Sequence, residues 1–211
     1  MDTPNFGEES QLNERVRECD SLDLAPTTTP SIIMTDRSNH DLLLGFARTW
    51  DLRQTMIFEE VYHENLRMDA DEKADLLKQA EAVWLYERGS RRLIGETYGI
   101  PIRDALDEDE DGFDDLVPFK HQKALYIFST TILPAFQGRG LGKILKAFFL
   151  GVVSQAGFDI VLGHARNGAS LHLNRTFGAE IRAVHEDWYG TGEPYSFYVI
   201  KPMSRESNHA H

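Results

Sequence analysis

The sequence predicts an α/β fold of the α+β type, and three features of the chain indicate it. Residues 125–133 form an apolar, β-prone run that leads through a glycine-rich turn into a helix. In that helix, apolar residues from Leu141 to Val153 recur at spacings of three and four, which gives one apolar face, with Lys143 and Lys146 off it. Residues 82–87 and 92–100 are β-prone runs around a glycine-containing turn, as in a hairpin. Helices are therefore expected to cover a sheet.

The remaining elements follow from the same patterns. Asp36 and Ser38 are candidate caps for a helix over 41–47, and Asp69 or Asp71 caps a later one. Gly157 is expected to end the long helix after the glycine-rich turn. In chain order we expect a strand at 31–35, helices at about 41–47, 54–66 and 69–80, the hairpin, a loop at 104–115, the strand and long helix, a strand at 158–163, a short helix at 169–176, and strands at 180–185 and 195–200.

The 211 residues suit one domain with tails. We place the domain at residues 31–203, between a polar extension at 1–30 and a tail at 204–211. Five consecutive acidic residues at 107–111 are typical of a solvated loop, although such a loop can also attract cationic ligands.

Composition narrows the function classes. The net charge of −12 argues against nucleic-acid binding and favours a cationic partner, although acidity also simply aids solubility. The sequence contains neither a membrane-spanning apolar run nor a signal peptide. Its single cysteine, Cys19, fits a reducing compartment, and we expect a cytoplasmic protein. The oligomeric state stays open, a homodimer included.

Residues 137–143 have the sequence QGRGLGK and are a candidate anion site, because glycines at a helix start expose backbone N–H groups. A P-loop is excluded, since Gln137 stands where its first glycine belongs and Ile144 replaces its Ser or Thr. A dinucleotide fingerprint is also excluded, since its third glycine would be Lys143.

The spacing that fits is Gln/Arg-x-x-Gly-x-Gly/Ala, formed by Gln137, Gly140 and Gly142 after an apolar-x-Pro segment at 132–134. This resembles the acyl-CoA-binding motif of the GNAT superfamily of N-acetyltransferases. A second GNAT-like signature lies at 167–179. Four of its positions match, and Asn174 stands where the family usually has tyrosine. The matching positions are Asn167, Ala169, Leu173 and Gly178.

The resemblance implies a GNAT fold over roughly residues 31–201, with a mixed, mostly antiparallel sheet. It implies acetyl-CoA as co-substrate and no metal. The glycine loop would hold the pyrophosphate, and the backbone at Ile132 and Leu133 would pair with the pantetheine arm and polarise the thioester carbonyl. The implied donor-binding residues are Ile132, Leu133, Gln137, Gly138, Arg139, Gly140, Leu141, Gly142, Lys143, Asn167 and Asn174.

Acyl transfer needs a neutral amine and a group that stabilises or protonates the leaving thiolate. Strand 125–132 has no acid, so Glu96 on the hairpin is the first candidate base, unless it simply faces solvent. Glu59 and Glu60 are second, and bulk water could also take the proton.

For the leaving thiolate, the Asn174 amide could donate a hydrogen bond. Tyr189 or Tyr195 could act instead, although packing roles suit both rings. His164 has no evident partner in the sequence for nucleophilic or metal chemistry.

The prediction is an N-acetyltransferase that moves an acetyl group from acetyl-CoA to an amine, on a small molecule or a protein, by direct attack in a ternary complex. Two alternatives stay open. One is a non-catalytic acyl-CoA-binding module. The other is a longer-chain N-acyltransferase of the autoinducer-synthase type.

Overall fold

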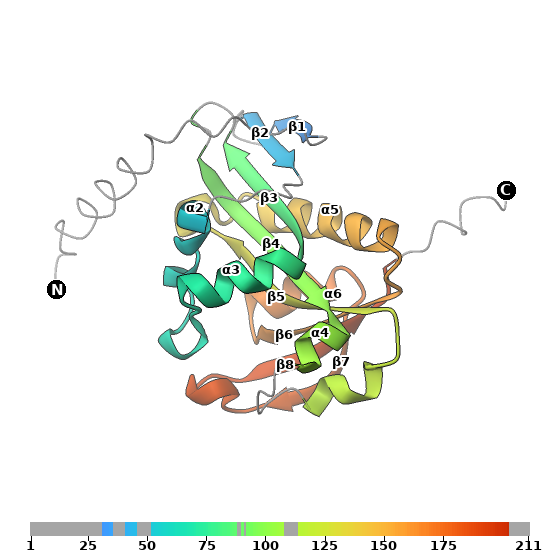
Figure 1. The fold of residues 1–211 in the computed structure, drawn as a ribbon. Helices are drawn as coiled ribbons and strands as arrows, with labels where there is room; N and C mark the ends of the chain where they lie inside the picture. The colour runs from blue at the N-terminus through green and yellow to red at the C-terminus, as the bar shows by residue number, and fades with distance from the viewer. Residues whose placement is uncertain are drawn as a thin grey trace, which may run out of the picture.

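The computed structural model describes residues 31–35, 41–45, 52–87, 90, 92–107 and 114–202. The described strands form one eight-stranded sheet in the order β1-β2-β3-β4-β5-β6-β8-β7 (Figure 1). Neighbouring strands are antiparallel except β5 and β6, which are parallel, so the sheet is mixed and mostly antiparallel as predicted. The strands are β1 (Ser31–Thr35), β2 (Asp41–Gly45), β3 (Glu81–Glu87), β4 (Leu93–Pro101), β5 (Ala124–Ile132), β6 (Ile160–Arg166), β7 (Glu180–His185) and β8 (Tyr195–Ile200).

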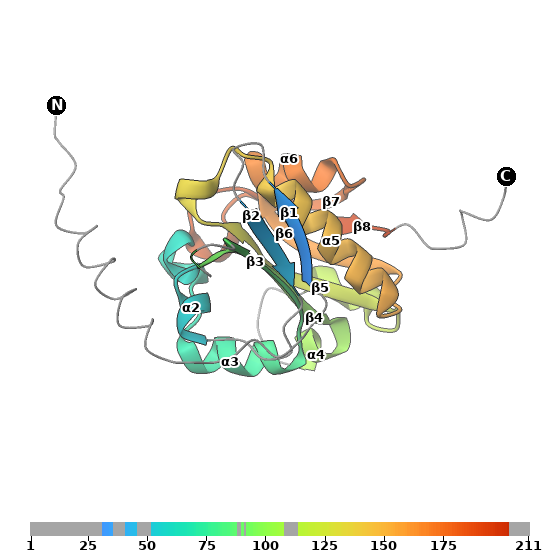
Figure 2. The same ribbon diagram turned by 90° about the horizontal axis from the view of Figure 1, so that it is seen from above.

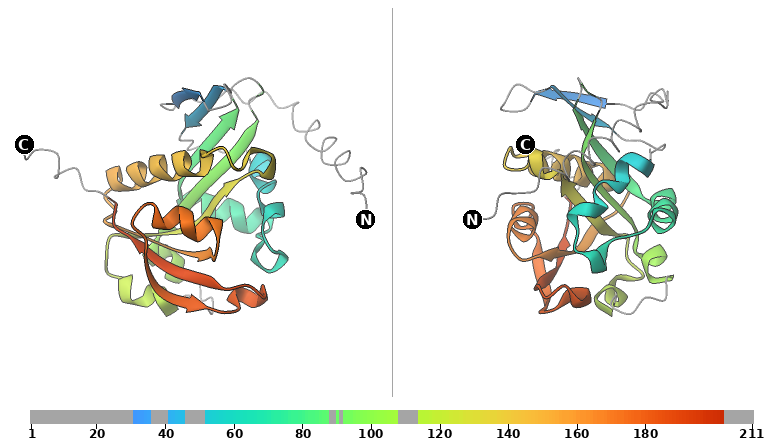
Figure 3. Two further views of the ribbon diagram at one scale, coloured as in Figure 1. Left: turned by 180° about the vertical axis from the view of Figure 1, so that it is seen from behind. Right: turned by 90° about the vertical axis from the view of Figure 1, so that its left-hand side faces the viewer.

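Helices cover both faces of this sheet (Figures 2 and 3). One core lies between the sheet and α5 with α6, and a second lies between the sheet and α3 with α4. None of the described helices combines the length and the apolar character that crossing a bilayer requires. The α-helices are α2 (Leu52–Met56), α3 (Ala70–Gln79), α4 (Ile102–Asp107), α5 (Leu141–Gln155) and α6 (Ala169–Arg175). Short 3-10 turns are η1 (Glu59–Val61), η2 (Glu64–Leu66), η3 (Asp114–Phe119), η4 (Pro134–Phe136) and η5 (Trp188–Gly190).

The ladder between β5 and β6 covers only part of both strands. It ends at Ile127 and Gly163, whereas β5 continues to Ile132. At the same point β5 has an extra residue, Phe128, in its pairing with β4, which is a β-bulge. Beyond this bulge, no described residue of β6 pairs with β5. The two strands therefore part before β5 ends, and the rest of β5 leads towards the glycine loop.

Two expected elements differ from the structure. Residues 41–45 are strand β2, not a helix, because three consecutive leucines give no polar helical face and the segment pairs with β1 and β3 instead. The helix expected over 54–66 breaks into α2, η1 and η2, since Tyr62 and His63 have non-helical backbones with ψ values of 157° and 144°. The expected caps Asp36 and Ser38, residues 46–47, the extension 1–30, the tail 204–211 and most of the acidic block lie outside the described residues.

Lys146 lies off the apolar face predicted from the sequence, yet the structure buries it. It is fully buried in α5, and its ammonium lies 3.4 Å from the Tyr198 hydroxyl, its only hydrogen-bond partner within the described part of the chain. The helix contacts β8 as well as the central strands, so a second face is covered and Lys146 lies on it. Burial lowers the pKa of Lys146 to about 7.

Lys146→Met is expected to raise the unfolding temperature at pH 7 by roughly 2–8 °C, because it removes a buried ammonium without a carboxylate. Between pH 7 and the ordinary lysine pKa of 10.5, the unfolded chain binds a proton that the folded chain lacks, so wild-type stability rises with pH. The advantage of the variant should therefore shrink as pH rises towards 10.5, as thermal unfolding across this range will measure. Lys143→Met, at an exposed position of the same helix, is the matched control. An equal gain in both variants contradicts the prediction.

Candidate functional site

The glycine loop between β5 and α5 keeps its backbone open. Gly138 and Gly140 have φ values of 75° and 79°, a region that side-chain-bearing residues rarely adopt. No atom lies within 4 Å of the position that a Cβ would take at either glycine. Gly140 is the N-cap of α5 and supplies no capping side chain. The start of this 15-residue helix can therefore receive an anionic group.

Neighbouring side chains fix the loop. The Gln137 Nε2 amide donates to the carbonyl of Ile132 at 2.9 Å, which joins the loop to the end of β5. Arg139 donates to the Ala135 carbonyl at 3.0 Å, and its guanidinium lies over the Phe136 ring. Two positively charged side chains, Arg139 and the exposed Lys143, thus flank the open glycines.

Part of the backbone expected to meet the pantetheine arm is engaged within the protein. The Leu133 N–H donates to the Ile94 carbonyl at 2.9 Å, and the Ile132 carbonyl accepts from Gln137. The stretch of β5 that has no β6 partner in the described ladder starts instead at Phe128. A ligand that extends the sheet would therefore meet β5 between this bulge and the glycine loop.

A buried charge cluster lies on the α3 face of the sheet, beside β5. Glu96 on β4 is 0 % exposed, and Glu59 in η1 is 3 % exposed. Both carboxylates contact the ammonium of the fully buried Lys73 on α3, at 2.9 Å and 2.7 Å respectively. The two acids named separately from the sequence therefore share one lysine, and the solvent-facing alternative for Glu96 is wrong. Glu60, the other acid named with Glu59, is exposed.

Hydroxyl groups connect this cluster to β5 beyond the bulge. Ser129 Oγ donates to Glu96 Oε1 at 3.2 Å, and the Tyr62 hydroxyl lies 2.7 Å from Ser129 Oγ and also contacts Thr131 Oγ1. Glu96 Oε2 and the buried Tyr98 hydroxyl have no hydrogen-bond partner among the described residues. Buried polar atoms of this kind normally form a hydrogen bond, so a bound water molecule or a ligand is expected to supply the partner.

Burial raises the pKa of Glu96 to about 7, and the adjacent Lys73 ammonium opposes this rise. Burial also raises the pKa of Tyr62, and the negative charge of Glu96 adds to this rise, so the phenol keeps its proton at neutral pH. A carboxyl that titrates near neutrality and touches a hydroxyl chain can accept a proton under physiological conditions.

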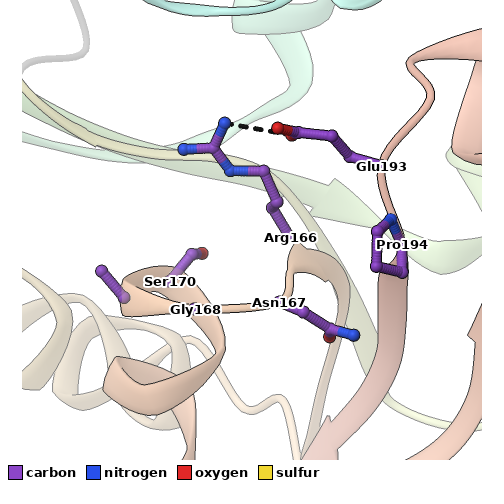
Figure 4. Close-up of a pocket in the computed structure, with 7 residues that line it drawn as sticks. Arg166, Asn167, Gly168, Ser170, Glu193 and Pro194 are labelled. Carbon is purple, nitrogen blue, oxygen red and sulfur yellow. Dashed lines mark hydrogen bonds and ion pairs between the residues drawn. The ribbon is translucent and has the colours of Figure 1, made fainter.

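The second signature region forms a small pocket where β6 meets α6 (Figure 4). Asn167 Oδ1 accepts a hydrogen bond from the Ser196 hydroxyl at 2.8 Å. Two other residues that line the pocket, Arg166 and Glu193, form an ion pair. Asn174 is 3 % exposed and donates its amide N–H to the Ser170 carbonyl at 3.0 Å, while its Oδ1 has no described partner. The Asn174 amide is thus engaged within its own helix.

Tyr189 has an unusual backbone. It is an exposed, non-glycine residue with φ 52°, in the loop between β7 and β8. The Asn65 side chain donates to the carbonyls of Tyr189 and Gly190, at 3.0 and 3.1 Å, and so ties η2 to η5. Tyr195, the alternative acid, begins β8 opposite His185. The structure thus holds Tyr189 in a strained loop that contacts the segment carrying Tyr62.

Sequence reasoning missed a second polar cluster on the same sheet face. Asp115 Oδ2 lies 3.2 Å from His164 Nε2 and 2.6 Å from His185 Nε2. His164 therefore has partners, contrary to the expectation of none. Burial lowers the pKa of His164 to about 4, and Asp115 opposes this shift, so its imidazole is neutral at pH 7. The three residues are far apart in the sequence, and no spacing motif could have found them.

Comparison with solved structures identifies the architecture. The ribosomal-protein-S18-alanine N-acetyltransferase from Escherichia coli superposes with a TM-score of 0.58 at 15% identity, covering 81% of this chain and 99% of that one. Arabidopsis thaliana NAA60 in complex with acetyl-CoA gives 0.60 at 14% identity, covering 76% and 98%. The chain has the GNAT fold.

The GNAT fold also includes proteins with other activities. The GphF GNAT-like decarboxylase in complex with isobutyryl-CoA superposes with a TM-score of 0.59 at 18% identity, covering 76% of this chain and 99% of that one. No protein-family model matches the sequence, and comparison with curated proteins finds no relative. At such low identity the likeness establishes the fold, and the activity has to be argued from the site.

Proposed function

We propose that this GNAT-fold chain is an N-acetyltransferase that moves an acetyl group from acetyl-CoA to an amine in a ternary complex. One observation carries the proposal: an open glycine loop starts α5 after β5, and the end of β5 from Phe128 to Ile132 has no partner in the described β6 ladder. The loop offers backbone N–H groups to a pyrophosphate, and the β5 edge offers a strand-like partner to an extended pantetheine arm. The predicted single domain over 31–203 would carry the whole site.

In the proposed complex, residues 138–143 bind the pyrophosphate through their N–H groups, with Arg139 and Lys143 adding positive charge. Gln137 acts indirectly, since it holds the loop against Ile132. The second signature, with Asn167, would line the other side of the donor site, while the Asn174 amide stays engaged within its own helix. The edge of β5 between Phe128 and the glycine loop, rather than the engaged backbone groups of Ile132 and Leu133, would hold the thioester beside the acceptor.

Glu96 is the proposed general base. The amine nitrogen attacks the thioester carbonyl carbon, the C–S bond breaks, and the amine loses a proton. Because Glu96 is 0 % exposed, this proton would reach it through the hydroxyls of Tyr62 and Ser129. The Glu96 pKa of about 7 suits this task at neutral pH.

For the leaving thiolate, Tyr189 is the better supported of the two predicted residues. Tyr189 is an exposed residue, whereas Asn174 is buried. The acceptor is an amine of a small molecule or a protein, and the net charge of −12 favours a cationic one.

Acetyl-CoA at a hundredfold excess over its dissociation constant is expected to raise the unfolding temperature by roughly 5–10 °C. Gly140→Asp should abolish this shift, because it places a carboxylate where the pyrophosphate would lie. Gly151→Asp puts the same charge at an exposed glycine in the middle of α5 and should keep the shift. Scanning fluorimetry of the three proteins checks this, with circular dichroism to confirm folding. Absence of any shift in the wild type with several acyl-CoAs would falsify the proposal.

A second candidate, an acyl-CoA-binding module without transfer activity, is favoured by Asn174 in place of the usual tyrosine. Thiol release with a panel of amines separates the two, since turnover with any amine rules this module out. The third candidate function is the transfer of longer acyl chains. It is tested by replacing acetyl-CoA with decanoyl-CoA in the same assay.

A further inference from the structure

We propose that Asp115, His164 and His185 form a binding site for a divalent transition-metal ion, with Zn²⁺ as the best match. The three residues come from three elements, η3, β6 and β7, which the sheet brings together on its α3 face. The site is separate from the glycine loop and from the Glu96 cluster. This proposal differs from the expectation, based on the family resemblance alone, that the protein binds no metal.

The ligand atoms are close to the spacing of a metal site. One ring nitrogen of His164, one of His185 and a carboxylate oxygen of Asp115 all lie within 4.8 Å of one another. In a tetrahedral zinc site with bonds of about 2.0–2.2 Å, neighbouring ligand atoms are about 3.3 Å apart. The distances from Asp115 Oδ2 to the two imidazole nitrogens, 3.2 and 2.6 Å, require only small side-chain shifts to reach that value.

The surroundings hold His164 in one orientation. Its Nδ1 lies 3.0 Å from the Tyr126 hydroxyl, and its ring stacks on Trp188 at 3.7 Å between centroids and an angle of 20°. When Nδ1–H donates to Tyr126, the lone pair of Nε2 points at Asp115 and His185, and a cation between them completes the arrangement. Metal-ligating histidines commonly have their second ring nitrogen held in this way.

The donor set selects the ion. Two imidazole nitrogens with one carboxylate suit Zn²⁺ and related transition metals, whereas Mg²⁺ and Ca²⁺ prefer oxygen ligands. The His164 side chain is 2 % exposed, but Asp115 and His185 are 23 % and 35 % exposed. Three protein ligands and access to solvent leave room for a water molecule, which is typical of zinc sites that do chemistry.

The competing arrangement contains no metal. In it, each histidine donates an Nε2–H to Asp115, and the Tyr126 hydroxyl donates to His164 Nδ1. Both arrangements use the same side chains, so binding must be measured directly.

The test uses the full chain after treatment with a chelator, without any acyl-CoA. Isothermal titration with Zn²⁺ should show one tight site, and Zn²⁺ should raise the unfolding temperature. His185→Ala should weaken this site by at least about 100-fold, because a ligand matters more than the outer-shell groups whose loss costs 10–100-fold. Asp115→Asn provides a second variant of unchanged size.

Controls separate this site from other histidines. His121→Ala and His172→Ala change exposed residues and should keep the site. The double change His209→Ala with His211→Ala removes the two histidines at the end of the sequence and should also keep it. Co²⁺ bound in place of Zn²⁺ should give the visible absorption of a site with nitrogen ligands. This measurement needs only the wild-type protein.

The proposal is overturned if the wild type binds no Zn²⁺, if its Co²⁺ spectrum is that of the hydrated ion, or if the double terminal variant loses binding while His185→Ala keeps it. None of these readouts requires acetyl transfer. A failure of this proposal is therefore distinguishable from a failure of the proposed function.

Discussion

Glu96→Gln is expected to lower kcat for amine acetylation by about 10²- to 10⁴-fold, which is the usual contribution of a general base. Glutamine has nearly the same shape as glutamate, so the contacts with Lys73 and Ser129 can persist in the variant. Because the proposed acetyl-CoA site is the glycine loop, the effect of acetyl-CoA on the unfolding temperature should be unchanged. The measurement is steady-state thiol release with the best acceptor of the amine panel.

The pH dependence makes this prediction more specific. Wild-type kcat should rise with pH as Glu96 ionises, with an apparent pKa near 7, and this limb should disappear in Glu96→Gln. Tyr62→Phe, which removes the outer hydroxyl of the proposed relay, should lower kcat without moving the acetyl-CoA effect. Glu60→Gln changes an exposed neighbour of Glu59 and serves as the control, with activity close to wild type. Full activity in Glu96→Gln would remove Glu96 from the mechanism.

Elements with local signals were predictable from the sequence. Helix α3 is capped by Asp69, which forms a capping box with Glu72, and α5 follows the glycine loop and has a periodic apolar face. Strand β2 was not predictable, because a leucine run of this length fits a helix or a strand until its neighbours are known. The burial of Lys146 depends on β8, which lies about fifty residues further along the chain.

The candidate site also contains some parts that were predictable from the sequence and others that were not. The glycine loop is a local motif, and its open conformation matches the prediction. Glu96 was a plausible base by elimination, but its environment is made by Lys73, which is 23 residues away, and by Ser129, 33 residues away. The histidine cluster joins Asp115 to residues 49 and 70 positions later. Such groupings arise only when the sheet brings distant segments together.

Lys73→Met is expected to destabilise the folded chain by about 3–5 kcal/mol, because it leaves Glu59 and Glu96 buried without their shared cation. Without the ammonium, the pKa of Glu96 should rise further. The folded variant then holds a proton that the unfolded chain releases near the ordinary glutamate pKa of 4.5, so the variant loses stability as pH rises above that value. Urea unfolding at pH 5 and pH 8 should therefore show the larger deficit at pH 8.

The matched control lies on the same helix. Lys78 pairs with Asp75 at the surface of α3, so Lys78→Met should change the free energy of unfolding by less than about 1 kcal/mol. Adding Glu59→Gln and Glu96→Gln to Lys73→Met should recover part of the lost stability, because no buried charge of the cluster then remains. Equal effects of Lys73→Met and Lys78→Met, or a deficit that does not depend on pH, would contradict the buried cluster. Recovery in the triple variant would show that the lysine is needed because the two carboxylates are there.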